Sequence, residues 1–81
     1  PSTGAPAAVR EAATAAIASE VLGYTVALGI PELRSAIAAH YARTYDLDVP
    51  PDQVVVTTGS SGGFLLAFLA AFDAGDRVVM A

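Results

Sequence analysis

The sequence predicts an α/β fold in which two helices are followed by a β-α-β unit of a mainly parallel sheet. In the first half, apolar residues recur every fourth position, which is the period of an amphipathic helix. The second half begins with the β-branched run Val54–Val56, which continues into a Ser/Gly-rich loop and the wholly apolar stretch Phe64–Phe72. A strand, a helix and a second strand in that order are typical of a parallel sheet.

The two helices of the first half have recognisable start and stop signals. Residues 7–22 are good helix formers that end at Gly23, and Pro6 suits a first helical turn because its missing N–H has no partner there in any case. The second helix covers residues 31–45, with Pro31 at its first position and apolar side chains at every fourth position.

The second half divides into the parts of the β-α-β unit. Residues Gln53–Thr57 read as a strand covered on both faces, because they include three consecutive valines. Residues Thr58–Gly63 predict a turn, and Phe64–Phe72 predicts a buried helix because it is apolar on all sides. Asp73–Asp76 predicts a second turn, and Arg77–Ala81 the start of a second strand.

Composition excludes several classes of function. The net charge is −4 and the four basic residues are scattered, so we expect no nucleic-acid partner. The sequence has no Cys and a single His, which disfavours a metal site, and no apolar run has the roughly 18 residues of a membrane span. We expect a cytoplasmic protein. Because 54% of the residues are hydrophobic and 15% are charged, we also expect apolar faces that another domain or subunit covers.

The loop Thr57–Gly63 is the segment most suggestive of chemistry. Small residues between a strand and a helix let an anion approach the unpaired N–H groups of the helix N-terminus, and hydroxyls add further donors. We therefore predict that Ser60 and Ser61 head a helix whose first N–H groups face an anion-sized concavity. A tight turn with a Ser cap is the alternative.

A second chemistry fits the same loop. Gly59–Gly63 matches G-x-S-x-G, the nucleophile elbow of serine hydrolases, with Ser61 as the nucleophile. In those enzymes the acid and the His follow the Ser, whereas His40 precedes it here. This alternative is the weaker one.

Four ordered motifs together resemble the class I/II aminotransferases of the pyridoxal-phosphate (PLP) transferase fold, over essentially the whole chain. Pro1–Pro6 resembles the family's Pro-rich entry, and Tyr24–Arg34 is similar to its Tyr…Gly-x-x-x-Leu-Arg signature. Val54–Ser61 resembles its phosphate-loop strand and turn, and Asp73–Val79 its Gly-Asp segment before the next strand.

The resemblance implies PLP as cofactor and assigns roles to individual residues. It implies that Gly59 permits the loop turn and that the N–H groups of Ser60 and Ser61 bind the cofactor phosphate. The Tyr24 hydroxyl is implied to reach the phosphate of the neighbouring subunit in a homodimer, and Arg34 to be structural. No catalytic residue is implied in this chain. The implied substrates are an amino acid and a 2-oxo acid.

The resemblance also implies an N-terminal fragment. Residues 1–50 correspond to an arm and the helices leading into the large domain, and residues 51–81 to the start of the PLP-binding domain. The strands at 54–57 and 78–81 are implied to be parallel but not neighbours. Because the sequence has no Lys to attach the cofactor, the chain alone cannot be a transaminase. Another PLP-fold enzyme, such as a carbon–sulfur lyase, or a regulator with this domain is the alternative.

Overall fold

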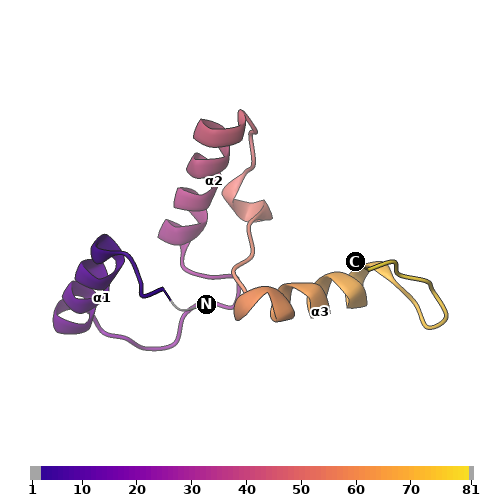
Figure 1. The fold of residues 1–81 in the computed structure, drawn as a ribbon, viewed down its shortest axis with the longest axis horizontal. Coiled ribbons are helices and arrows are strands. Elements are labelled where there is room, and N and C mark those ends of the chain that lie inside the picture. Colours follow the sequence, from indigo (N-terminus) through magenta and orange to yellow (C-terminus); the bar gives the residue numbers. More distant parts are fainter. Residues whose placement is uncertain (1–2, 81) are drawn as a thin grey trace.

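The structure is open, and its helices point in three directions. The computed structural model describes residues 3–80 and contains α1 (Ala7–Ser19), α2 (Pro31–Tyr45), the short 3-10 helix η1 (Pro51–Gln53) and α3 (Gly59–Ala71). Figure 1 shows α1 and α3 extending to opposite sides of α2, and η1 lying beside α2. Of these elements, only η1 and α2 pack extensively against each other within the described part of the chain.

The first helix is shorter than the sequence predicts. It begins after Pro6 as expected but ends at Ser19, and Glu20 already has an extended backbone (φ −115°, ψ 154°). The three residues lost include Val21, which is 98% exposed, and Leu22, which is 66% exposed. Short helices depend on packing of an apolar face, and these side chains have no surface within residues 3–80 to pack against.

The second helix has the predicted bounds, Pro31–Tyr45. Pro31 occupies its first turn together with Glu32, whose charge suits the positive end of the helix dipole. It ends at Asp46, which adopts a left-handed conformation (φ 53°) and whose N–H donates to the Tyr41 carbonyl. The left-handed backbone of Asp46 therefore ends the helix upstream of Pro50, a residue type that would itself interrupt a helix.

The two strands of the predicted β-α-β unit are not formed, and no residue from 3 to 80 is in a strand. Residues 51–53 form η1, and Val54 is extended (φ −99°, ψ 123°) without a ladder partner. Residues 77–80 are also irregular, and Ala81 lies outside the described residues. A strand exists only when a neighbouring strand accepts and donates its backbone hydrogen bonds. The described residues supply no such neighbour, so the β-branched preference alone does not produce a sheet.

The helix of the β-α-β unit is present but begins five residues earlier than the apolar run predicts. α3 starts at Gly59, so most of the predicted turn Thr58–Gly63 is helical. The expectation that this helix is buried is also wrong for residues 3–80, since Phe64 is 60% exposed and Leu69 is 73% exposed. The predicted turn Asp73–Asp76 is confirmed, because the Asp76 N–H donates to the Asp73 carbonyl at 3.1 Å.

The chain has much more surface than a compact domain of its mass. Its accessible area is 7205 Å², against about 4,500 Å² for a compact protein of 8.2 kDa. Its radius of gyration is 16.4 Å, against about 12 Å for a compact domain of this length. No hydrophobic side chain among the described residues is fully buried, which is consistent with the predicted apolar faces.

We expect the 81-residue chain alone to unfold without a cooperative thermal transition, because residues 3–80 form no buried core. A compact domain of this size absorbs about 55 kcal/mol near its melting temperature. Differential scanning calorimetry and circular dichroism measure the transition. A sharp transition with an enthalpy near that value would show that the chain forms a core of its own.

Candidate functional site

The turn into α3 is the best-defined candidate site. Gly59, at the first position of the helix, has a positive φ of 77°, a conformation that other residues adopt only with strain. Its N–H donates to the Thr57 carbonyl at 2.8 Å, and the Thr57 hydroxyl donates to the Gly59 carbonyl, also at 2.8 Å. These two hydrogen bonds hold the backbone in a tight turn before the helix begins.

The Gly59 N–H is engaged in the turn, whereas the N–H groups of Ser60 and Ser61, the next in α3, have no acceptor among the described residues. Ser60 and Ser61 follow Gly59 in the first turn, so the prediction that they head a helix is confirmed. The first N–H groups of a helix have no partner within it, and no side chain of the described residues caps this end. The first turn also contains no acidic residue. With the positive end of the helix dipole, this arrangement suits an anion.

A hollow of about 670 Å³ lies between α3 and the segment that follows it. Ser61 is the only polar residue of its lining within the described part of the chain; the others are Phe64, Phe68, Val78, Val79 and Met80. This hollow is apolar, so it does not by itself define the anion-sized concavity that the sequence predicts. That part of the prediction stays open.

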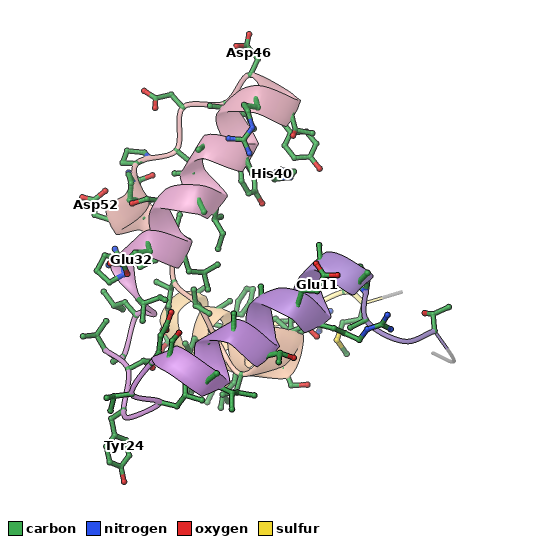
Figure 2. All side chains as sticks on the ribbon, turned by 90° about the vertical axis from the view of Figure 1, so that its left-hand side faces the viewer. Glu11, Tyr24, Glu32, His40, Asp46 and Asp52 are labelled. Carbon is green, nitrogen blue, oxygen red and sulfur yellow. The ribbon has the colours of Figure 1, made fainter. Side chains whose placement is uncertain are left out.

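Tyr24 does not pack against the helices of the described residues. It is fully exposed in the loop between α1 and α2, and Figure 2 shows its ring pointing away from the rest of the chain. The structure does not direct it toward Ser60 or Ser61. The Tyr24 hydroxyl is therefore accessible to solvent, and the role that the resemblance implies for it stays a prediction.

A group of contacts that the sequence did not predict connects this loop region to the segment before α3. The Val56 N–H donates to the Leu28 carbonyl at 3.0 Å, and Arg34 Nε donates to the Val54 carbonyl at 2.8 Å. Gly29, with φ 95°, lies so close to Val56 that a Cβ atom on it would be 2.6 Å from Val56 Cγ2. We call these three contacts the clasp. Arg34 therefore has a structural contact, as expected.

The geometry disfavours the serine-hydrolase alternative. A nucleophile elbow places its Ser on a strained turn, whereas Ser61 lies inside α3 and the positive φ belongs to Gly59. His40 is engaged on its own helix: its ring lies edge-on to the Tyr45 ring at 5.8 Å, and its Nδ1 is 3.3 Å from the Thr44 hydroxyl.

The described residues show neither of two other kinds of site. Residues 3–80 contain no group of three or more His, Cys, Asp or Glu side chains placed to hold a metal ion. Within the same range, no helix has the length and apolar character needed to cross a bilayer.

The family of the chain follows from its sequence as a whole. The family model described as aminotransferase class I and II matches residues 1–81, the full length of the chain. The chain belongs to this family. The resemblance to aminotransferases is thereby confirmed, and the family is one of enzymes that generally use PLP.

Aminotransferases of several organisms are similar to the chain. It is 70% identical over 81 residues to a valine–pyruvate aminotransferase of Mycobacterium tuberculosis, covering 100% of this chain and 21% of that protein. It is 35% identical over 80 residues to an aspartate aminotransferase of Pyrococcus horikoshii, covering 99% of this chain and 20% of the relative. The chain therefore spans about a fifth of the length of these relatives.

A solved aminotransferase contains the same arrangement of helices. The chain superposes on a crystal structure of an aminotransferase from Mycobacterium tuberculosis with a TM-score of 0.89 and 70% identity, covering 95% of this chain and 21% of that one. The PLP transferase fold therefore fits the chain. The separation of α1, α2 and α3 also occurs within a longer aminotransferase chain.

We expect Gly59→Ala, in a full-length aminotransferase carrying this segment, to lower the free energy of unfolding by roughly 1–2 kcal/mol, because an alanine is strained at positive φ. Gly23→Ala is the matched control: an added Cβ meets no atom within 4 Å at either position, and only Gly59 has a positive φ. Denaturant titration measures both variants. Equal stabilities would show that the turn relaxes without cost.

Proposed function

We propose that these 81 residues are the N-terminal part of a PLP-dependent aminotransferase subunit that acts in the cytoplasm. The reaction is the transfer of an amino group between an amino acid and a 2-oxo acid. The proposal rests on the match of the aminotransferase family to the whole chain and on the chain's share, about a fifth, of its relatives' length. When bound, PLP supplies the electron sink for chemistry at the amino acid's α-carbon.

The N-terminus of α3 is the observation that supports a cofactor role for this segment. In the proposal, Gly59 sets the turn, and the N–H groups of Ser60 and Ser61 donate to the phosphate of PLP. The positive φ of Gly59 and the absence of a side-chain cap on α3 among residues 3–80 both support this role. A phosphate at a helix N-terminus satisfies donors that have no partner within the helix.

Tyr24 is proposed to serve a second subunit. Its full exposure and its direction away from the rest of the chain in Figure 2 leave the hydroxyl free to reach a neighbouring molecule. In a homodimer it would donate a hydrogen bond to the cofactor phosphate of the partner. One chain would then contribute to two cofactor sites, through Tyr24 in one and Ser60–Ser61 in the other.

The complete subunit is proposed to supply what these residues lack. Residues 1–50 form the arm and helices leading into the large domain, and residues 51–81 begin the PLP-binding domain. Residues 54–57 and 78–81 are proposed to be parallel strands of the complete subunit that are not neighbours, with other strands between them. The β-branched sequence of the first and the extended backbone of Val54 support this. The cofactor-binding Lys must come from outside this sequence, which has none.

The 70% identical relative also suggests a substrate pair. It is named for valine and pyruvate, and we propose an aliphatic amino acid and pyruvate as the substrates here. A carbon–sulfur lyase or a regulator with this domain is the second candidate from the sequence, but the relatives described above are all named as aminotransferases.

We expect a full-length enzyme carrying this segment to convert valine and pyruvate to the corresponding 2-oxo acid and alanine, and the 81-residue chain alone to be inactive, because it has no Lys. Alanine formation in the presence of PLP measures both. Activity of the short chain would contradict the proposal. Sulfide release from cysteine without amino transfer by the full-length enzyme would favour the lyase.

We expect Tyr24→Phe in the full-length enzyme to weaken PLP binding about ten- to a hundredfold while the dimer stays intact, because a hydrogen bond to a charged phosphate is lost. Tyr45→Phe is the control, since Tyr45 is another exposed tyrosine and lies at the end of α2. Titration of the apoenzyme with PLP measures the affinity. Unchanged affinity in Tyr24→Phe would reduce Tyr24 to a packing residue.

A further inference from the structure

The clasp connects the α2 region to the segment that leads into the candidate phosphate site. In the first of its three contacts the Val56 N–H donates a hydrogen bond to the Leu28 carbonyl. The second is the close approach of Gly29 to the Val56 side chain. The third is made by a side chain, the Arg34 guanidinium, whose Nε donates to the Val54 carbonyl at 2.8 Å.

Arg34 is well placed to hold this segment in position. It lies in the first turns of α2, and its own N–H donates to the Ile30 carbonyl at 3.2 Å, so its backbone is fixed by the helix. Its side chain is half-buried, as are Val54, Val56 and Thr57 in a chain that is mostly exposed. A charged donor in such a place forms a stronger hydrogen bond than a neutral one.

The path from Val54 to the site is short and restrained at each end. Val54 is held by Arg34, and Val56 is held by Leu28. Thr57 and Gly59 are joined by two hydrogen bonds of 2.8 Å, and α3 begins at Gly59. The position of the first N–H groups of α3 therefore depends on where the clasp holds residues 54–56.

We propose that Arg34 is a positioning residue for the cofactor-phosphate site, acting through the Val54 carbonyl and not by touching the cofactor. This rests on the proposed function of Ser60 and Ser61. Because N–H donors bind an anion only at well-defined distances and angles, a shift of residues 54–57 weakens the phosphate contacts before it disturbs the remainder of the cofactor site.

The phosphate group itself provides a specific readout. Pyridoxal has the ring and aldehyde of PLP but no phosphate, so the ratio of its dissociation constant to that of PLP measures what the phosphate site contributes. Both ligands are titrated into full-length apoenzyme and followed by absorbance, with the parent enzyme, Arg34→Met and Arg34→Lys. Arg43→Met is the control, because Arg43 lies in the last turn of the same helix.

We expect Arg34→Met to lower the pyridoxal-to-PLP ratio about tenfold, mainly by weakening PLP binding, because a charge-assisted hydrogen bond to the segment is lost. Arg34→Lys keeps a charged donor but not the planar guanidinium, so we expect an intermediate ratio. Arg43→Met should keep the parent ratio. If Arg34→Met does not fold, the ratio of Arg34→Lys is compared with that of the parent enzyme instead.

Two failures of this experiment have different meanings. A parent enzyme that binds pyridoxal as tightly as PLP lacks a phosphate site, and this result would overturn the proposed function. A parent with a clear preference for PLP that Arg34→Met and Arg34→Lys both retain would overturn the positioning role alone. Equal weakening of both ligands would also overturn it, since a general loss of structure does not distinguish the phosphate.

Discussion

The contact of Gly29 with Val56 is the constraint on which the arrangement of this chain depends. Only a residue without a Cβ atom lets the loop before α2 approach Val56 so closely, and the same position requires a positive φ. Once the two segments are that close, the Leu28 carbonyl can accept from Val56 and Arg34 can reach Val54. The backbone that leads into α3 is thereby placed relative to α2.

The open shape makes this constraint more important than it is in a compact domain. In a domain with a core, contacts among many buried side chains determine how the helices and strands lie relative to one another. A single contact then contributes little to their placement. Here no hydrophobic side chain of the described residues is fully buried, and α3 exposes apolar groups on all sides. The few half-buried residues are concentrated around the clasp and the turn at Thr57.

The clasp lies between the two segments that are proposed to contact cofactor. Tyr24 and the N-terminus of α3 are on opposite sides of the clasp in sequence, and in the proposed enzyme they serve different cofactor sites of a dimer. A single set of contacts would then set the geometry of both contributions. The exposed apolar side chains of α1 and α3 are consistent with the expectation, from a hydrophobic content of 54%, of apolar faces that another domain or subunit covers.

The sequence by itself determined the features that depend on local chemistry: the bounds of α2, which begins at Pro31, the turn at Asp73–Asp76, the place of Ser60 and Ser61 in the first turn of a helix, and the family. Only the tertiary structure decided the end of α1, the absence of strands among residues 3–80 and the clasp. The reason is physical. Strands, and the last turn of a short helix such as α1, need partners distant in sequence, and neither periodicity nor propensity says whether those partners are near.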